Sequence, residues 1–411
     1  MNSNTVWPDH SGKPETTDLM ALLGQSASAI DTPALILDLD AMERNLERMA
    51  RFARDQGLRL RPHAKMHKSA QIAKLQMAAG AVGVCVQKTE EAERLAAAGV
   101  SDIYISNEVV SLAKLARVVA LSDRMAASGG QLSLAVDSEQ GFEHLSQALS
   151  KAKHPIKVLV ELDVGHGRCG IPLGDLFVAL VQRVKAGKSM IFAGLQAYHG
   201  RVQHVRTKQA RQSEIARVEQ IVRDAITALR SVNIDVPLVS GAGTGCFGYE
   251  SISGVYGELQ VGSYLFMDAD YAKNEVDPAF PSFEHALFVK TQVMSVSGQH
   301  AVCDAGHKSH AIDSGMPMIY DRPDLEYRVG GDEHGIIVGR SAQSVLPLMG
   351  EVLWLIPGHC DPTVNLHDYM IGVRRAQPEG ATLSSMGSSA SDLTGTWVER
   401  IIIVDARGAL R

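Results

Sequence analysis

The sequence has few cysteines, no long apolar run and no concentrated positive charge, and each absence argues against a class of protein or a kind of partner. The five cysteines among 411 residues are widely spaced and form no CxxC pair, which indicates reduced thiols in a cytoplasmic protein. No stretch approaches about 18 consecutive apolar residues, and Met1–Met20 lacks the order of a signal peptide, so we expect a soluble chain. A net charge of −6 without runs of Lys or Arg argues against nucleic acid or a membrane as partner. A small-molecule substrate is the expectation that remains.

The length and the spacing of β-rich runs predict an α/β barrel as the larger of two domains. A chain of 411 residues exceeds the size at which one hydrophobic core stops growing. From Leu58 to about Val261, short β-rich runs alternate with helical segments, which predicts a TIM-type (β/α)8 barrel. The predicted strands are Leu58–Arg61, Val82–Val86, Ile103–Ser106, Leu132–Val136, Lys157–Leu162, Ile191–Ala197, Val236–Val239 and Glu258–Val261.

After about Pro281 the sequence predicts a mostly antiparallel β domain, because strand-like runs are separated there by Gly and short polar turns. An extra strand at Ala34–Asp38, followed by a helix, is expected to join this domain. We therefore expect an N-terminal segment at 1–40, a barrel at 41–275 and a β domain at 281–411. A mobile loop rich in Gly, Ser and Thr is expected over Pro378–Thr394.

Lys65 is the leading candidate for a reactive group. It follows the first predicted barrel strand, at the rim where α/β barrels carry their active sites. Basic and imidazole neighbours such as His63 and Lys68 disfavour an ammonium ion, so Lys65 could react as a neutral amine and form a Schiff base. A solvated loop lysine is the alternative. Other strand exits carry polar side chains too, among them Gln87, Arg168, Tyr198, His204 and Tyr264.

A small-residue loop, Ser240-Gly241-Ala242-Gly243-Thr244-Gly245, could bind a phosphate through converging backbone N–H groups and the Ser240 and Thr244 hydroxyls. Its glycine pattern is neither the Rossmann fingerprint nor a Walker loop, and a ligand-free tight turn is the alternative. A reactive Lys65 and a phosphate loop together indicate pyridoxal 5'-phosphate as the cofactor, because it needs an amine partner and a phosphate anchor. Arg168 could then hold the ring oxygen of this cofactor, although a surface arginine is equally compatible with the sequence.

His359 and Asp361 form a candidate metal site just after the apolar run Val352–Ile356. If the backbone stays extended, both side chains lie on one face and Cys360 points away. A local hydrogen bond between the two is the alternative. An imidazole with a carboxylate favours a divalent ion such as Mn²⁺, Mg²⁺ or Co²⁺ over the zinc that a thiolate would recruit.

Seven segments together resemble the D-threonine aldolase and D-serine dehydratase group of alanine racemase-like pyridoxal phosphate enzymes. The resemblance implies a homodimer in which Lys65 forms the internal aldimine and Arg168 and Tyr198 contact the cofactor ring. It also implies that Gly241, Gly243 and Thr244 hold the phosphate and that His359 and Asp361 bind the metal; Gln87, Ser240 and Tyr264 are expected as further cofactor contacts. The segments are Pro62-His63-Ala64-Lys65, Glu161-x-Asp163-x-Gly165-x-x-Arg168-x-Gly170, Tyr198-His199-Gly200-x-x-Gln203-His204, Gly241-x-Gly243-Thr244-Gly245, Gly262-Ser263-Tyr264, Asp332-Glu333-His334-Gly335 and His359-Cys360-Asp361-Pro362-Thr363-Val364-Asn365.

The residue two positions after His359 separates two reactions within this group. Dehydratases of the group carry a His-x-Cys motif with zinc, whereas aldolases carry His-x-Asp with a manganese-type ion. This sequence has Asp361 and so resembles the aldolases. We therefore expect an aldolase that cleaves D-3-hydroxy amino acids into glycine and an aldehyde, with His204 relaying a proton. A D-serine or D-3-hydroxyaspartate dehydratase is the alternative, and a non-catalytic pyridoxal phosphate carrier is a third hypothesis.

Overall fold

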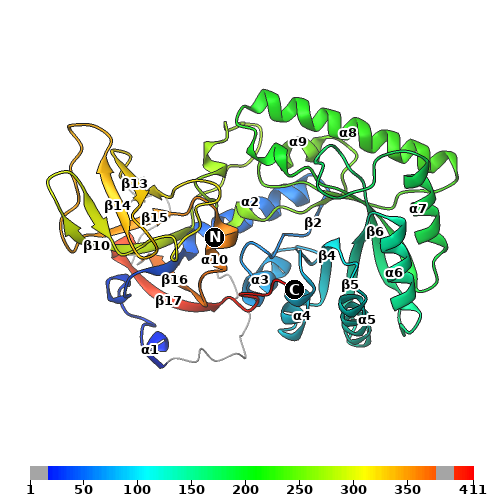
Figure 1. The fold of residues 1–411 in the computed structure, drawn as a ribbon, viewed down its shortest axis with the longest axis horizontal. Helices are drawn as coiled ribbons and strands as arrows, with labels where there is room; N and C mark the ends of the chain where they lie inside the picture. Colours follow the sequence, from blue (N-terminus) through cyan, green and yellow to red (C-terminus); the bar gives the residue numbers. More distant parts are fainter. Residues whose placement is uncertain (1–16, 376–392) are drawn as a thin grey trace. The chain divides into compact units, whose positions relative to one another are not determined.

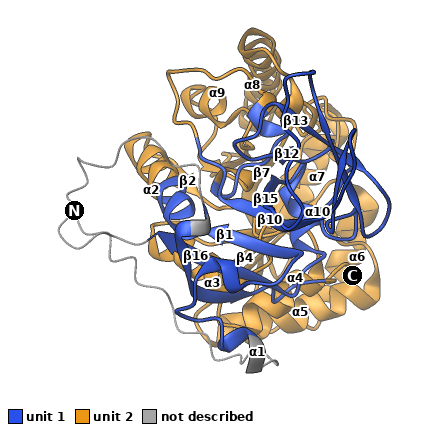
Figure 2. Cartoon of the chain, turned by 90° about the vertical axis from the view of Figure 1, so that its left-hand side faces the viewer, with its two compact units in different colours: residues 1–46, 265–272, 283–407 blue, residues 47–264, 273–282, 408–411 orange. Residues whose placement is uncertain are grey.

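The computed structural model describes residues 17–375 and 393–411, and the chain divides into two compact units (Figure 1, Figure 2). The first, which we call the β unit, comprises residues 1–46, 265–272 and 283–407. The second, the barrel unit, comprises residues 47–264, 273–282 and 408–411. Most of the loop predicted at Pro378–Thr394 lies outside the described residues.

Eight parallel strands form the sheet of the barrel unit, in the order β2-β9-β8-β7-β6-β5-β4-β3. Backbone hydrogen bonds from Cys85 N to Pro62 O and from Ala64 N to Cys85 O, both 2.8 Å, link the chain after β2 to β3. The two end strands are thereby joined, so the sheet closes on itself. The strands are β2 Arg59–Leu60, β3 Val84–Val86, β4 Asp102–Glu108, β5 Gln131–Val136, β6 Ile156–Glu161, β7 Met190–Ala197, β8 Val239–Gly241 and β9 Glu258–Leu259.

Helices connect these strands and cover their outer face (Figure 1). Apolar strand residues such as Leu134 and Val158 belong to one hydrophobic cluster with helix residues such as Leu145 and Leu180. Burial of this apolar surface is the main favourable term in folding a barrel. The helices are α3 Ala70–Ala78, α4 Thr89–Ala97, α5 Leu112–Ala127, α6 Glu139–Leu149, α7 Asp175–Ala186, α8 Lys208–Ser231 and α9 Phe247–Ile252.

The β unit is built on a nine-stranded sheet with the path β13-β14-β11-β10-β1-β16-β17, and β15 pairs with both β10 and β12. Strand β1 lies between β10 and β16; its pairing with β16 is parallel and all other pairings in this sheet are antiparallel. The strands are β1 Ala34–Asp38, β10 Leu287–Val296, β11 Ala301–Cys303, β12 Met318–Ile319, β13 Leu325–Val329, β14 Gly335–Gly339, β15 Val352–Ile356, β16 Tyr369–Arg375 and β17 Thr396–Ile403.

Three further α-helices and five short 3-10 turns complete the described secondary structure. The long α2 begins in the β unit, directly after β1, and ends in the barrel unit. The helices are α1 Thr17–Met20, α2 Leu39–Asp55 and α10 Cys360–Val364; the turns are η1 Ala27–Ala29, η2 Arg201–His204, η3 Ser263–Leu265, η4 Tyr271–Lys273 and η5 Leu393–Gly395.

The predicted fold class is confirmed, since a TIM-type barrel of eight parallel strands is accompanied by a mostly antiparallel β sheet. All eight predicted barrel strands are present, but β8 begins at Val239, three residues later than the predicted start at Val236. Pro237 lacks a backbone N–H and cannot donate to a neighbouring strand, which explains the later start. Strand β12, of two residues, was not predicted because it is too short to show an alternation.

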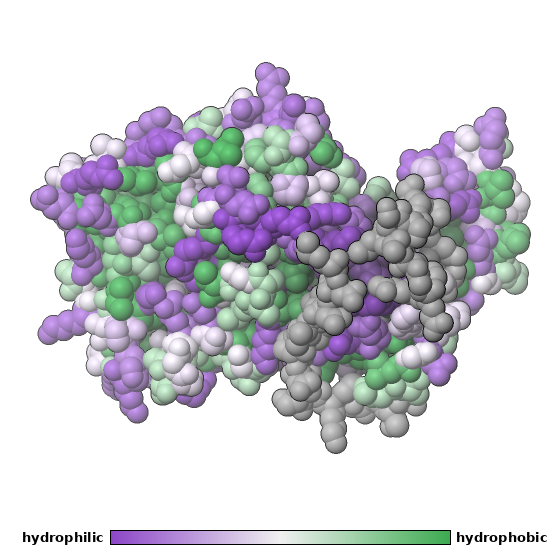
Figure 3. All heavy atoms as spheres, turned by 180° about the vertical axis from the view of Figure 1, so that it is seen from behind, coloured by the Kyte–Doolittle hydropathy of each residue, from purple (hydrophilic) through white to green (hydrophobic). Residues whose placement is uncertain are grey.

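The exterior gives no sign of a membrane-spanning segment in the part of the chain that is described. None of its helices has both the length and the apolar character that are needed to span a bilayer. The face shown in Figure 3 carries polar side chains interspersed with apolar ones. Isolated exposed apolar residues of this kind are normal on protein surfaces.

One arginine of the β unit, on β16, forms ion pairs with carboxylates of α2 and β17. Arg374, on β16, contacts Asp40 Oδ1 at 2.6 Å and Glu43 Oε1 at 2.8 Å, both on α2, and also pairs with Glu399 on β17. The Glu43 side chain is only 8% exposed, and these acidic neighbours raise the pKa of Arg374. The guanidinium therefore compensates three negative charges where α2 meets the sheet.

We predict that Arg374→Met lowers the free energy of unfolding by about 3 kcal/mol, because it leaves clustered carboxylates without their cation. The matched control is Arg328→Met on β13, where Arg328 and its partner Glu326 are 59% and 36% exposed. We expect this control to cost less than about 1 kcal/mol. Urea unfolding followed by circular dichroism measures both variants, and equal losses for the two would contradict the prediction.

Candidate active site

Lys65 lies at the rim of the barrel unit, on a segment that two neighbouring strands hold in place. The buried ring of His63 approaches Gln87 Nε2 at 2.9 Å and Ser106 Oγ at 3.3 Å, and its Nδ1 accepts from Lys65 N at 3.5 Å. Gln87 follows β3 and Ser106 lies on β4. The backbone that carries Lys65 is therefore fixed by side chains from the adjacent strands.

The cationic neighbour of Lys65 is compensated by a carboxylate, which corrects part of the sequence interpretation. Lys68, with a left-handed φ of 51°, is buried and forms an ion pair with the buried Glu91 of α4. Glu91 Oε2 also accepts from the backbone N–H groups of Gln87 at 2.9 Å and Lys88 at 3.1 Å. Because Glu91 compensates the charge of Lys68, Lys68 disfavours the ammonium form of Lys65 less than the sequence suggests.

Lys65, Arg168 and Tyr198 converge, although they are far apart in the sequence. The Arg168 guanidinium carbon lies 5.7 Å from the centre of the Tyr198 ring. Burial raises the pKa of the Tyr198 phenol to about 12, against the opposing effect of the positive charges of Lys65 and Arg168. The phenol therefore stays protonated at neutral pH and can donate a hydrogen bond. These three residues form the core of the candidate site in the barrel unit.

The loop Ser240–Gly245 is shaped by close packing against the barrel. A Cβ on Gly241 would lie 2.3 Å from Ala197 O, and one on Gly243 would lie 2.5 Å from Gln203 Oε1, so neither position accepts a side chain without movement. Ala242 between them has a left-handed φ of 70°, a turn that can direct successive N–H groups to one side. Such a loop fits an anion.

Not every hydroxyl of this loop is available to an anion. Ser240 is fully buried, donates to Glu258 Oε1 at 2.7 Å and accepts from Gln260 Nε2 at 2.8 Å. Thr244 Oγ1 accepts from Tyr264 N at 2.9 Å, and the Tyr264 hydroxyl accepts from Gln76 Nε2 at 3.1 Å. Ser240 and Tyr264 thus hold the loop in place through these hydrogen bonds. The role of Ser240 as a phosphate ligand stays a prediction.

The predicted proton relay, His204, is exposed at the end of η2, whereas its neighbour Gln203 is completely buried. Two other histidines lie near Tyr198: the His166 ring centre is 6.2 Å from that of Tyr198 and 5.8 Å from that of His199. Burial, with help from nearby arginines, lowers the pKa of His166 to about 4. His166 is therefore neutral at physiological pH, and its closeness to Tyr198 was not foreseen from the sequence.

The candidate metal residues lie together in the β unit. His359 Nε2 is 3.9 Å from Asp361 Oδ1, a separation that one ion could bridge. His359 Nδ1 lies 2.7 Å from Asp313 Oδ2 and 3.3 Å from Ser314 Oγ, so the other ring nitrogen is turned toward Asp361. A carboxylate on the second ring nitrogen is the usual way in which proteins orient a metal-binding histidine.

The backbone at this site is helical, so the expectation of an extended segment is wrong. His359 is the N-cap of α10, and Cys360 and Asp361 already belong to its first turn. Pro362 provides the physical reason, since proline is well tolerated in the first turn of a helix and its fixed φ favours the start of one. Cys360 is completely buried, which is consistent with a thiol that points away from the pair.

Two acidic residues near this pair escaped the sequence analysis. Asp313 contacts His359, and the fully buried Asp268 accepts from Cys360 N at 3.2 Å. Burial raises the pKa of Asp268 to about 6, and the negative charge of Asp361 adds to the shift. Neither residue lies in a recognisable motif, so only the fold reveals them.

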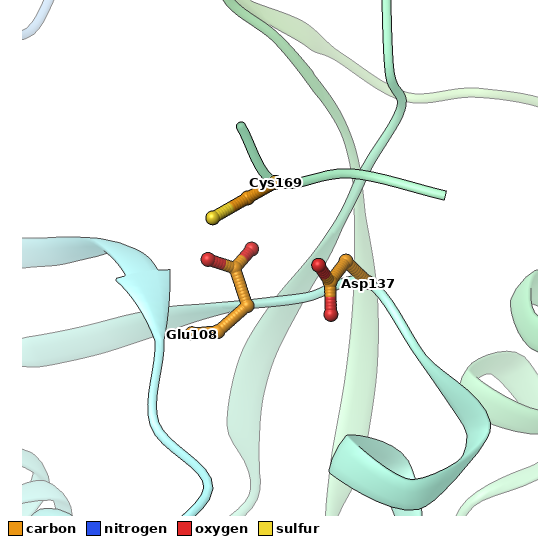
Figure 4. Close-up of side chains that lie close together, drawn as sticks. All are labelled: Glu108, Asp137 and Cys169. Carbon is orange, nitrogen blue, oxygen red and sulfur yellow. The ribbon is translucent and has the colours of Figure 1, made fainter. Parts of the chain in front are cut away.

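A second acidic cluster lies at the rim of the barrel unit. Donor atoms of Glu108, Asp137 and Cys169 all lie within 4.8 Å of one another (Figure 4). Burial and the neighbouring Glu108 raise the pKa of Glu161, so the two carboxyls disfavour each other's ionisation. The sequence shows polar residues after several barrel strands, but it contains no pattern that brings Glu108, Asp137 and Cys169 together.

Comparisons with known proteins agree with this geometry. Residues 37–270 match the family model described as alanine racemase, N-terminal domain, and residues 286–373 match a putative serine dehydratase domain. The chain is 41% identical to a 3-hydroxy-D-aspartate aldolase of Paracoccus denitrificans, over 92% of this chain and 97% of that one. It is 44% identical to a D-threonine aldolase of an Arthrobacter species, over 85% of this chain and 91% of that one.

A solved structure extends the similarity to the whole fold. The crystal structure of D-threonine aldolase from Filomicrobium marinum superposes with a TM-score of 0.86 at 45% identity, over 95% of this chain and 98% of that one. A D-threo-3-hydroxyaspartate dehydratase of a Delftia species is more distant, with 33% identity over 58% of this chain and 62% of that one. The barrel with its rim residues, the second β unit and these similarities lead to one assignment: the chain belongs to the alanine racemase-like family, within its group of D-threonine and 3-hydroxy-D-aspartate aldolases.

Proposed function

We propose that this protein is a lyase that cleaves D-3-hydroxy amino acids of the D-threonine type into glycine and an aldehyde, using pyridoxal 5'-phosphate and a divalent metal. The observation that carries the proposal is the His359–Asp361 pair, with 3.9 Å between Nε2 and Oδ1, in a chain whose relatives at 41% and 44% identity are aldolases by name. Cys360 is completely buried in the first turn of α10, which favours the carboxylate over the thiol as the second ligand.

The residues of the barrel unit fit the cofactor. Lys65 would bind its aldehyde, Arg168 and Tyr198 would contact its ring, and the loop backbone at Gly241, Gly243 and Thr244 would hold its phosphate. The close packing of both glycines is consistent with this assignment, since added side chains would collide with Ala197 O and Gln203 and displace the loop. When bound, the cofactor supplies an electron sink for the bond that breaks at Cα. Gln87 and Tyr264 act indirectly in this proposal, by holding His63 and Thr244.

The residues of the β unit fit a hard divalent ion, for which we propose Mn²⁺, with Mg²⁺ or Co²⁺ as substitutes. One imidazole and one carboxylate are a ligand set that such ions accept, and Asp313 turns the imidazole toward Asp361. A bound ion lowers the pKa of a hydroxyl or water that it binds. We also propose His204 as a proton carrier of the reaction, which is consistent with its exposed position on η2. The family resemblance also supports a homodimer.

The products distinguish the proposed reaction from its alternative. We expect purified protein with Mn²⁺ to convert D-threonine into glycine and acetaldehyde, and D-3-hydroxyaspartate into glycine and glyoxylate, as measured by chromatography. A chelator should abolish the activity, and added Mn²⁺ should restore it. Formation of 2-oxobutanoate and ammonia from D-threonine would instead identify a dehydratase and refute the aldolase, and activity that survives full chelation would refute the metal's role.

Lys65→Ala tests the cofactor linkage. We expect this variant to lose the visible absorbance band of the bound cofactor and the covalent trapping of the cofactor by borohydride, because no amine remains at that position. Lys74→Ala, on the neighbouring helix α3, is the matched control and should keep both signals. Trapping at full stoichiometry in Lys65→Ala would place the linkage on another lysine.

Asp313→Asn tests the orientation of the metal-binding histidine independently of activity. Loss of the carboxylate charge behind His359 Nδ1 should weaken Mn²⁺ binding by about 10-fold to 100-fold, as measured by equilibrium dialysis. Asp321→Asn, an exposed turn residue of the same unit, is the control. An unchanged dissociation constant in Asp313→Asn would show that Asp313 does not orient the ligand.

A further inference from the structure

Gln203 links two strand exits of the barrel unit through its side-chain amide. It lies on η2, after β7, and is completely buried. Its Oε1 accepts from Gly245 N at 2.9 Å, in the loop that follows β8. Its Nε2 donates to His199 O at 3.2 Å and approaches Cys246 Sγ at 2.6 Å. One amide therefore fastens the end of the Ser240–Gly245 loop to the neighbouring turn.

The glycines of the loop are needed to accommodate Gln203. A Cβ on Gly243 would lie 2.5 Å from Gln203 Oε1, and a Cβ on Gly245 would lie 2.5 Å from the Gln203 carbonyl oxygen. That carbonyl also accepts from Asn274 Nδ2 at 2.8 Å, so Gln203 is held from behind as well. The loop backbone thus lies directly on the Gln203 side chain, which determines where the loop N–H groups point.

The side-chain amide satisfies the groups on both sides of this position. Gly245 N–H requires an acceptor and His199 O requires a donor, which fixes the orientation of the Gln203 amide. Behind it, Cys246 Sγ donates to Glu250 Oε2 at 3.0 Å, and Glu250 is completely buried. Burial raises the pKa of Glu250 to about 8, so at neutral pH this carboxyl places no full negative charge behind the loop.

We propose that Gln203 is a positioning residue for the cofactor phosphate: it holds the Gly241–Gly245 backbone in its anion-binding geometry and keeps a neutral group behind the bound phosphate. The inference rests on the proposed function, in which this loop binds the phosphate of pyridoxal 5'-phosphate. It predicts an effect that depends on the phosphate and not on the pyridine ring or the aldehyde.

The test compares pyridoxal 5'-phosphate with pyridoxal, which lacks the phosphate. Full-length protein is freed of cofactor, and the affinity for each compound is measured by absorbance titration. Gln203→Met, which keeps the volume but removes both hydrogen-bonding functions, should weaken the phosphorylated cofactor about tenfold while pyridoxal changes less than about twofold. Gln203→Glu should weaken it as well, because the carboxyl has no N–H to donate to His199 O and its ionised form adds negative charge behind the phosphate.

The controls separate this role from a general loss of structure. Gln209→Met, at an exposed position on α8, should leave both affinities unchanged. Gln203→Glu keeps the shape of the side chain and provides the measurement if Gln203→Met does not fold, as judged by circular dichroism. Equal weakening of both compounds, or unchanged affinities in a folded Gln203 variant, would overturn the role of Gln203. Equal affinity of the wild-type protein for both compounds would overturn the phosphate assignment itself.

Discussion

The parallel hydrogen bonding of the eight barrel strands is the constraint on which the candidate site depends. Because all eight strands run in one direction, their carboxyl ends meet at one rim, and residues more than a hundred positions apart become neighbours. Lys65 and Tyr198 are the clearest case, since the charge of the lysine acts on the phenol. The hydrogen bonds of Cys85 with Pro62 and Ala64 join the end strands, and they lie immediately before Lys65. The hydrogen bonds that close the barrel therefore also place Lys65.

Several buried polar groups around this rim are paired with groups from neighbouring segments, and these pairs hold the backbone that carries them. Glu91 forms an ion pair with Lys68 and accepts hydrogen bonds from two backbone N–H groups, while Ser240 is hydrogen-bonded to both Glu258 and Gln260. A buried polar group without its partner is costly, so each such pair restricts the backbone to one arrangement. The same principle operates in the β unit, where Asp313 fixes the ring of His359. In both units the groups proposed to react are oriented by residues that do not react.

The sequence allowed the prediction of the barrel, the second unit and the motif residues, because each leaves a local pattern. Strands buried on both faces read as apolar runs, and a functional group after such a run reads as a strand exit. Asp313 and Asp268 leave no such pattern, since only the fold brings them near His359 and Asp361. The geometry at His359 was derived from an extended strand, yet the pair meets in the first turn of a helix, for which Pro362 was the available signal.

The central place of β1 in the sheet of the β unit has a consequence for the synthesis of the chain. Strand β1 is made before the barrel strands, but its partners β10 and β16 follow only after all eight barrel strands have been made. A barrel built from successive strand–helix units can form as it emerges, whereas this sheet must wait for contacts that are distant in sequence. During that interval the apolar Leu35, Ile36 and Leu37 lack their strand partners. The sheet that β1 begins is therefore completed only when β16 and β17 have been made.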